Sequence, residues 1–258
     1  MSGGSGNVPS MTSDARAALV TGAASGIGRA VAARLEAEGF RVLAVDREAA
    51  DDGPGVAHQA DLTTREGNRG AIDAALERFG RLDAVVPIAG FQHVSPVAEF
   101  DEDRWDALIA VLLTSPFLLA KYGWEALRRS GAGRFVVIAS AHGLVASPFK
   151  AGYVSAKHGV LGLVKTLALE GAEHGIAATA ICPGYVRTPL VEQQIADQAR
   201  AHGLPEDRVL EDVILAPHAV KRLIEPEQVA DAVVFLLGPA GAPFTGSPFV
   251  MDQGWTAR

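Results

Sequence analysis

The chain has 258 residues, a formal net charge of −7, 48% hydrophobic residues and 21% charged residues. This balance fits one globular domain with a large core, because single α/β domains often reach about 250 residues. The acidic charge argues against nucleic acid as a partner, since nucleic-acid-binding surfaces are basic. Cys182 is the one cysteine, which excludes an internal disulfide and a multi-cysteine metal site. No run approaches the roughly 18 unbroken apolar residues of a membrane span.

The first thirteen residues are rich in Gly, Ser, Asn and Pro and contain no Lys or Arg. They lack the apolar segment of a secretory signal, so we interpret residues 1–13 as a flexible tail. Residues 14–258 are expected to form one domain. The absence of an export signal together with a lone thiol favours a cytoplasmic location.

Apolar runs alternate with helical patterns along the whole chain. The expected strands are Ala17–Thr21, Arg41–Val45, Val56–Ala60, Leu82–Ile88, Arg134–Ala139, Ala177–Cys182 and Pro248–Met251. The expected helices are Gly26–Glu38, Arg65–Phe79, Glu102–Ser130, Gly152–His174 and Pro226–Leu237. Several strands are continuous apolar runs, which is typical of parallel strands covered on both faces. The alternation predicts an α/β, Rossmann-like fold: a doubly wound parallel sheet in a single domain, with helices on both faces.

Residues 183–221 interrupt this alternation. The segment is long and mixed in character, and it follows the carboxyl end of a strand. Ligands bind at that end of the strands in doubly wound sheets. We therefore interpret the segment as a candidate substrate lid.

A glycine-rich turn joins the first expected strand to the first expected helix, with the sequence TGAASGIG over residues 21–28. Gly22 permits a tight turn, Gly26 lets the backbone approach a pyrophosphate, and Gly28 lets the helix pack closely on the strand. The amino end of the helix then offers free N–H groups and partial positive charge to phosphates. Three glycines alone are weak evidence, but their place between a strand and a helix predicts a dinucleotide site.

Two carboxylates follow the second and third expected strands. Asp46 lies 18 residues after Gly28, where a carboxylate can accept both ribose hydroxyl groups of NAD and repel a 2′-phosphate. Arg47 would weaken that preference, and the alternative for Asp46 is a surface residue that opens a turn. Asp61 could hold the adenine amino group, although alone it would more often be a helix-entry residue. Together these residues indicate NAD as the cofactor.

Tyr153 and Lys157 are four residues apart, which places them on one face of an expected helix. A tyrosine pKa near ~10 is too high for proton transfer at neutral pH. A cation about 4 Å away is worth up to roughly 4 kcal/mol at an effective dielectric constant of about 20, so Lys157 would bring the phenol pKa toward the working pH. Ser140, thirteen residues before Tyr153 at a strand end, could hold a carbonyl oxygen. The spacing of Tyr and Lys is common by chance, but with Ser140, Asp46 and the glycine turn it predicts a catalytic set.

At this point the chain resembles the short-chain dehydrogenase/reductase family over residues 16–254. The resemblance rests on the turn at 21–28, Ala89-Gly90, Ser140, Tyr153, Lys157 and Pro183-Gly184. Within that family, longer segments are similar to those of the D-3-hydroxybutyrate dehydrogenases. These segments are GFQHVSPV (90–97), SAHGLVASPFK (140–150), CPGYVRTPL (182–190), QQIADQ (193–198) and DQGWTA (252–257).

The resemblance implies an NAD-dependent interconversion of (R)-3-hydroxybutyrate and acetoacetate. It also implies that Tyr153 exchanges the hydroxyl proton and that Ser140 orients the carbonyl. By the same resemblance, Lys157 lowers the Tyr153 pKa and binds the nicotinamide ribose. The implied cofactor contacts are Thr21, Gly22, Ser25, Gly26, Ile27, Gly28, Asp46, Asp61, Leu62, Ala89, Gly90, Tyr153, Lys157, Pro183, Gly184, Val186 and Thr188. The implied substrate contacts are Gln92, His142, Lys150, Tyr153, Gln194 and Trp255. Of these, the substrate carboxylate would be bound by Gln92, His142, Lys150 and Gln194. The resemblance also implies a homotetramer built on the long apolar helices. No metal site is expected, because the seven histidines are scattered without metal-ligand spacing.

The chain departs from the family at two places. Pro87-Ile88-Ala89-Gly90 stands where the family usually has Asn-Asn-Ala-Gly, and Leu112 stands where it has a catalytic Asn. That Asn holds a water of the proton relay through its backbone, so Leu112 either preserves the relay through its own carbonyl or slows the enzyme. The alternatives left open are the same chemistry on another small hydroxy acid or hydroxy ketone, and a weakly active NAD(H)-binding regulatory paralogue.

Overall fold

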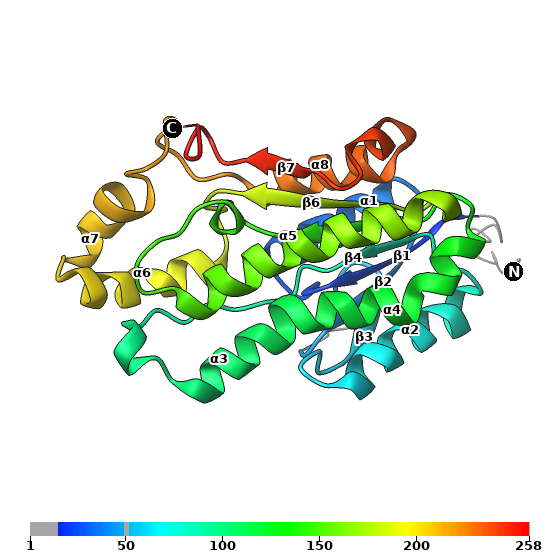
Figure 1. Ribbon diagram of the computed structural model, residues 1–258, viewed down its shortest axis with the longest axis horizontal. Helices are drawn as coiled ribbons and strands as arrows, with labels where there is room; N and C mark the ends of the chain where they lie inside the picture. Colours follow the sequence, from blue (N-terminus) through cyan, green and yellow to red (C-terminus); the bar gives the residue numbers. More distant parts are fainter. Residues whose placement is uncertain (1–14, 49–51, 258) are drawn as a thin grey trace, which may run out of the picture.

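Figure 1 shows the protein as a computed structural model, which describes residues 15–48 and 52–257. The predicted tail, residues 1–13, lies outside the described residues. The strands form one sheet with the order β3-β2-β1-β4-β5-β6-β7, and every pair of neighbours is parallel. Their bounds are β1 Ala17–Thr21, β2 Arg41–Asp46, β3 Val56–Gln59, β4 Ala84–Val86, β5 Arg134–Ile138, β6 Ala177–Pro183 and β7 Pro248–Met251. The predicted doubly wound, single-domain fold is confirmed.

Helices cover both faces of the sheet (Figure 1). Their bounds are α1 Gly26–Ala37, α2 Arg65–Phe79, α3 Glu102–Ile109, α4 Ser115–Arg129, α5 Ala151–Gly171, α6 Pro189–His202, α7 Glu206–Val209 and α8 Pro226–Leu237. Helices α1 and α8 pack together on one face, whereas α2, α4 and α5 lie on the other. The expected helix over 102–130 is continuous but contains a π-helical turn, Ala110–Thr114, between α3 and α4.

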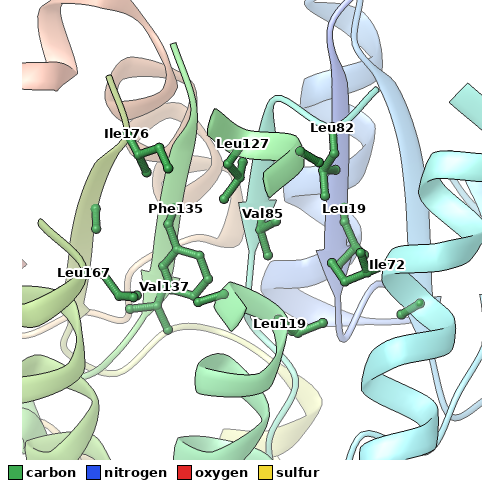
Figure 2. Packing of buried hydrophobic residues seen from close by; sticks show 14 of the residues in the cluster. Leu19, Ile72, Leu82, Val85, Leu119, Leu127, Phe135, Val137, Leu167 and Ile176 are labelled. Carbon is green, nitrogen blue, oxygen red and sulfur yellow. The ribbon is translucent and has the colours of Figure 1, made fainter. Parts of the chain in front are cut away.

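The sheet separates two apolar cores because successive side chains of a strand point to opposite faces. Leu19 of β1 and Phe135 of β5 face the core under α2, α4 and α5, which Figure 2 shows from close by. Their neighbours Val20 and Val136 face the core under α1 and α8. All four are buried, so the sheet is a rigid platform whose strand ends carry the candidate site.

Strand β4 is shorter than the predicted strand Leu82–Ile88 because of Pro87. Its carbonyl accepts the N–H of Ile138 at 3.0 Å, but proline has no N–H to return to the neighbouring strand. The N–H groups of Ile88 and Ala89 instead donate to the Thr21 hydroxyl at 2.9 and 3.0 Å. The chain therefore leaves the sheet at Pro87 and enters the site.

The candidate lid contains helices that the sequence analysis did not predict. Residues 189–214 form α6, α7 and a π-helical turn, Leu210–Ile214. Pro189 begins α6 and Gly203 ends it with a left-handed backbone, two positional signals that the mixed apolar pattern concealed. Tyr185, Val191 and Ile214 lie in a separate apolar cluster under these helices, so the segment has its own small core.

Among the described residues, one helical segment, Glu102–Arg129, is long and apolar enough to cross a membrane by length and composition alone, with a mean hydropathy of 1.5. Half of its apolar window is buried inside the fold. Leu108, Leu119 and Leu127 of this segment are among the most buried side chains of the protein. These features describe a core helix of the domain.

Candidate active site

The strand order places a ligand site at the carboxyl ends of β1 and β4. The chain runs outward from β1 through β2 to β3, and then crosses back to β4 on the other side of β1. Doubly wound sheets bind their ligands at such a switch point. Two adjoining cavities open there, a larger groove and a smaller pocket. Their shared walls contain Ile27, Ile88, Gly90, Thr188 and Leu190.

The glycine turn forms one wall of the groove. Gly22 has a left-handed backbone (φ +68°), and a Cβ on it would lie 2.9 Å from the Ala89 backbone. A Cβ on Gly28 would lie 2.0 Å from the Gly22 carbonyl oxygen, so both residues must be glycine for the turn to close. Ser25 precedes α1 without capping it through its side chain, which leaves the first backbone N–H groups available. This cradle fits the pyrophosphate of a nicotinamide dinucleotide.

Two carboxylates stand farther along the groove. Asp46 accepts the N–H of Ala24 at 3.0 Å with one oxygen and the N–H of Glu48 at 3.2 Å with the other. It therefore ties β2 to the glycine turn while remaining part of the groove wall. Asp61 accepts both the N–H and the hydroxyl of Thr63, at 2.9 and 2.7 Å, and these bonds hold the pKa of the Asp61 carboxyl below its usual range.

The structure places most of the predicted cofactor residues in the two cavity walls. The groove is lined by Gly22, Ser25, Gly26, Ile27, Gly28, Asp46, Asp61, Leu62, Ala89, Gly90 and Thr188. The pocket is lined by Tyr153, Lys157, Pro183, Gly184 and Val186. Thr21 is in neither wall: its side chain is buried and its hydroxyl holds the Ile88–Ala89 backbone. Its place in the structure is that of a support beneath the groove.

The predicted catalytic residues meet at the pocket's inner end. Ser140 follows β5, its hydroxyl accepts the N–H of His142 at 3.1 Å, and its interaction with the Tyr153 phenol favours a lower pKa of that phenol. Lys157 lies one turn after Tyr153 in α5, with its ammonium nitrogen 5.5 Å from the centre of the Tyr153 ring. The same ammonium donates to the carbonyl of Ile138 at 2.7 Å. An acid–base phenol, a hydroxyl and a cation are thus assembled around one point.

The electrostatics of this set differ from the simplest expectation. Burial raises the pKa of the Tyr153 phenol, and the hydrogen bond with Ser140 acts in the opposite direction. Burial also lowers the pKa of Lys157 to about 8. Because the ammonium is directed at the Ile138 carbonyl, a lowering of the Tyr153 pKa by Lys157 stays a prediction.

A buried lysine stands elsewhere in the same pocket. Lys150 is 2% exposed, and its ammonium donates to the Tyr185 hydroxyl at 2.8 Å and to the Gln194 side-chain carbonyl at 3.5 Å. Within the part of the chain that the structure describes, no carboxylate lies within ion-pair distance of it. Burial lowers its pKa to about 8. A buried cation held by neutral oxygens is suited to bind an anion.

The backbone before Lys150 is in an uncommon conformation. Phe149 has a φ of +67°, a left-handed value that costs on the order of 1–3 kcal/mol in a non-glycine residue. Its carbonyl accepts the N–H of Ser95 at 2.9 Å, and its ring lies edge-on to His202 of α6 at 5.3 Å between centroids. Helix α6 is therefore in contact with Phe149, which directly precedes Lys150.

His142 lies between the two ends of the pocket. Its ring centre is 6.0 Å from that of Tyr153 and 4.8 Å from that of Trp255, edge-on in both cases. Burial first, and the charge of Lys150 second, lower the pKa of His142 to about 3, so the ring is neutral at physiological pH. Its Nε2 is 2.9 Å from the Ser147 hydroxyl. His142 can therefore contribute a hydrogen bond to a substrate, but no charge.

The remaining predicted substrate residues also line the pocket. Gln194 donates to the carbonyl of Leu190 at 3.1 Å and turns its own carbonyl toward Lys150, so it orients the lysine. Gln92 accepts the N–H of His93 at 3.0 Å. Trp255 stands on a turn that the Asp252 carboxylate fixes by accepting backbone N–H groups.

Tyr185 is a residue of the site that was not predicted from the sequence. It lies two residues after β6, its ring is stacked on Trp255 with 5.6 Å between centroids, and its hydroxyl contacts Lys150. His218, which is also buried, packs against both aromatic rings, at 5.8 Å from Tyr185 and 5.2 Å from Trp255. The signal for Tyr185 was present, because it stands between the predicted cofactor residues Gly184 and Val186.

The two departures from the family pattern do not close the pocket. Ile88 lines both cavities, and Pro87 lies in neither wall. Leu112 lies in the π-helical turn, and its side chain fills the space in front of Gly90, where a Cβ would come within 2.4 Å of it. Leu112 is therefore a close-packed wall residue.

The comparisons with known proteins agree with this geometry. The family described as "Enoyl-(Acyl carrier protein) reductase" matches residues 22–256. The chain is 43% identical over 256 residues to the D-beta-hydroxybutyrate dehydrogenase of Rhizobium meliloti (strain 1021), covering 94% of this chain and 99% of that protein. This chain is a short-chain dehydrogenase/reductase. It is thus an oxidoreductase with a small-molecule substrate, in a fold that binds a nicotinamide cofactor.

Two further members of the short-chain dehydrogenase/reductase family extend the comparison. The D-beta-hydroxybutyrate dehydrogenase of Cupriavidus necator (strain ATCC 17699 / H16) is 37% identical over 254 residues, covering 94% of this chain and 98% of that protein. The crystal structure of an actinorhodin polyketide ketoreductase variant with NADPH superimposes with a TM-score of 0.89 at 30% identity, covering 96% of this chain and 99% of that one. The fold is therefore shared with an enzyme crystallised with the phosphorylated cofactor.

Proposed function

We propose that this chain is an NAD-dependent dehydrogenase that interconverts (R)-3-hydroxybutyrate and acetoacetate. The observation that carries the proposal is the buried Lys150, which shares one pocket with Ser140 and Tyr153 and has no carboxylate partner among the described residues. A small keto acid has one anionic end and one carbonyl, and this pocket offers a cation and an acid–base phenol. The similarity to two dehydrogenases of D-beta-hydroxybutyrate supports the same substrate.

When bound, the nicotinamide dinucleotide would accept a hydride in one direction and supply it in the other. Lys150 holds the carboxylate of the substrate, which fixes the orientation of the reacting carbon. Ser140 donates to the carbonyl or hydroxyl oxygen, and Tyr153 takes the hydroxyl proton during oxidation and returns it during reduction. His142, kept neutral by burial, lies along the substrate between these groups.

We propose NAD as the cofactor because of Asp46. Its carboxylate forms part of the groove wall at the end of β2, where it would accept ribose hydroxyl groups and repel a 2′-phosphate. Arg47, which also lines the groove, would oppose this preference. Its side chain is 80% exposed and pairs with Glu48 at 3.6 Å, which weakens its attraction for a phosphate.

Two finer properties complete the proposal. We propose a homotetramer, supported by apolar side chains on the outer faces of α4, α5 and α8: Phe117 is 45% exposed, Leu169 80% and Phe235 40%. A cytoplasmic location is proposed as well, on the basis of a single cysteine that lies buried at the end of β6.

The test follows NADH absorbance when the protein is mixed with NAD and (R)-3-hydroxybutyrate, with 2-butanol as the neutral substrate of equal carbon number. We expect kcat/KM for the acid to exceed that for 2-butanol by about 30-fold or more, since a buried charge contact is worth roughly 2 kcal/mol or more. Equal values would remove the acid from the proposal and favour a hydroxy ketone or alcohol. No turnover of either compound, together with tight NADH binding, would favour the regulatory paralogue.

A further inference from the structure

We propose that the Tyr185 hydroxyl determines which substrates the pocket accepts, by acting with Lys150 as a pair of donors for the two oxygens of one carboxylate. The identity of the acid rests on the proposed function, whereas the selection of a carboxylate rests on this pair. The inference starts from the 2.8 Å contact between the Lys150 ammonium and the Tyr185 hydroxyl oxygen.

The contact leaves a proton on each partner for a ligand. The ammonium uses one of its three N–H bonds on Tyr185, and the phenol oxygen that accepts this bond keeps its own O–H. Burial raises the pKa of Tyr185, so the phenol is protonated over the whole working range. Two donors only 2.8 Å apart can point to the two oxygens of the same carboxyl group, which is the bidentate arrangement that makes carboxylate recognition specific.

The donor pair is fixed before any ligand binds. The Tyr185 ring is stacked on Trp255, 5.6 Å between centroids and 5° from parallel, and is edge-on to His142 at 6.3 Å. The Lys150 ammonium lies 5.0 Å from the Tyr185 ring centre and is also within 3.5 Å of the Gln194 carbonyl. Packing on these sides prevents the phenol from turning away, and a donor that needs no reorganisation stabilises its ligand most.

The neighbouring polar groups already use part of their hydrogen-bonding capacity on other partners. Gln194 presents a carbonyl oxygen to the lysine and uses an amide N–H on Leu190. His142 is neutral and has Ser147 as a hydrogen-bond partner. The aromatic wall of Tyr185 and Trp255 lies beside the anion position in the pocket that also contains Tyr153. The structure thus points to hydroxy or keto carboxylic acids as the substrate class.

The test compares wild type with Tyr185→Phe, which keeps the stacked ring and removes only the hydroxyl. The probes are butyrate, a non-reacting acid with four carbons, and 2-butanone, its neutral counterpart. Their dissociation constants are measured by calorimetry on protein saturated with NAD, because 2-butanone would be reduced in the presence of NADH. Tyr122→Phe is the matched control, because Tyr122 lies on α4 against Arg69, outside both cavity walls.

We expect Tyr185→Phe to weaken butyrate about tenfold, the effect of one hydrogen bond to a charged group, with 2-butanone and NAD unchanged within about twofold. Tyr122→Phe is expected to behave as wild type. Three results would each overturn the proposal. The wild type and Tyr185→Phe could bind butyrate with equal affinity, Tyr185→Phe could lose equal affinity for butyrate and 2-butanone, or the wild type could fail to bind butyrate. Should Tyr185→Phe fail to bind NAD, Tyr185→Met, which also lacks the hydroxyl, is measured in its place.

These readouts separate the inference from the proposed function. A wild type that binds butyrate through Tyr185 but does not oxidise 3-hydroxybutyrate would retain the donor pair and refute the proposed substrate. A wild type that oxidises 3-hydroxybutyrate while Tyr185→Phe binds butyrate with full affinity would retain the function and refute the role of Tyr185.

Discussion

The ammonium nitrogen of Lys157 lies 2.7 Å from the carbonyl oxygen of Ile138, and this bond ties α5 to the carboxyl end of β5. Ser140 stands two residues beyond Ile138, and Tyr153 stands one turn before Lys157. The bond therefore fixes the separation of the two elements that carry the catalytic hydroxyl groups. Since β6 and all but the first residue of β5 are buried, the set is held on the core of the sheet.

Replacement of the phenol hydroxyl at this junction tests the proton transfer. Tyr153→Phe is expected to lower kcat about 10²–10⁴-fold, the usual contribution of a positioned acid–base group. The ring remains packed against α3 and the π-helical turn, so NADH affinity and the melting temperature should change little. Stopped-flow absorbance measures kcat, fluorescence titration measures NADH affinity, and thermal unfolding gives the melting temperature. Activity close to that of wild type would assign the proton transfer to another group.

Removal of the buried cation should affect function and stability in opposite directions. Lys150→Met is expected to raise KM for 3-hydroxybutyrate about 30-fold or more, while KM for 2-butanone stays the same. The free energy of unfolding should rise by about 1–3 kcal/mol, because a buried charge without an ionic partner is replaced by an apolar side chain of similar length.

Urea unfolding and steady-state kinetics measure both effects of Lys150→Met. Lys165→Met is the matched control, since Lys165 is exposed on the outer face of α5. The control should leave KM unchanged. A destabilised Lys150→Met with an unaltered KM would show that the lysine serves the fold and not the substrate.

The pH dependence of substrate binding should follow the same lysine. Burial lowers the Lys150 pKa to about 8, so the ammonium that attracts the carboxylate is present below pH 8 and is lost as the pH rises through it. KM for the acid should therefore rise about tenfold per pH unit above this value. KM for 2-butanone should not depend on the Lys150 ammonium, because 2-butanone has no carboxylate. An acid KM that stays constant from pH 7 to about 9.5, or the same rise in the Lys150→Met variant, would disprove the assignment.

Much of the fold was predictable because the strands are short, apolar and separated by regular helical patterns. Ala17–Thr21 and Pro248–Met251 have the predicted bounds, and the order of elements is the expected one. Strand β4 is shorter than predicted for a local reason, because Pro87 has no N–H. The proline is visible in the sequence, but the apolar run around it favoured a longer strand. The lid helices escaped prediction because α6 packs on a small separate cluster and is largely polar outside it.

The candidate site was partly predictable for a different reason. The glycine turn, Asp46 and Tyr153 have positions that backbone geometry and residue chemistry dictate. The positions of the partners of Lys150 are not dictated in this way, because Tyr185 and Gln194 are 35 and 44 residues away and meet Lys150 only in the folded chain. Side-chain contacts between residues so far apart in the sequence depend on how α6 packs over the pocket. The hydrophobic periodicity of the sequence does not indicate that packing.

The cofactor preference can be tested at Asp46 without dismantling the turn. Asp46→Asn removes the charge but keeps an oxygen that can accept the N–H of Ala24. The ratio of kcat/KM for NAD over NADP is expected to fall about tenfold, mainly through better use of NADP, because the repulsion of a 2′-phosphate is removed. An unchanged ratio would mean that another residue, such as Arg47, reads the ribose. Asp73→Asn is the control, because Asp73 is exposed on α2 and lies in neither cavity wall.

The consequence of Leu112 can be measured by restoring the family residue. In Leu112→Asn the backbone carbonyl of the π-helical turn is unchanged, so we expect kcat to stay within about threefold of wild type, below 1 kcal/mol in activation free energy. The free energy of unfolding should fall by about 1–3 kcal/mol, because an amide replaces a buried side chain packed against Leu108 and Ala156. Leu113→Asn, in the same turn but against Gly159, controls for the destabilisation. A kcat that rises by about tenfold or more in Leu112→Asn alone would show instead that the missing amide limits the proton relay.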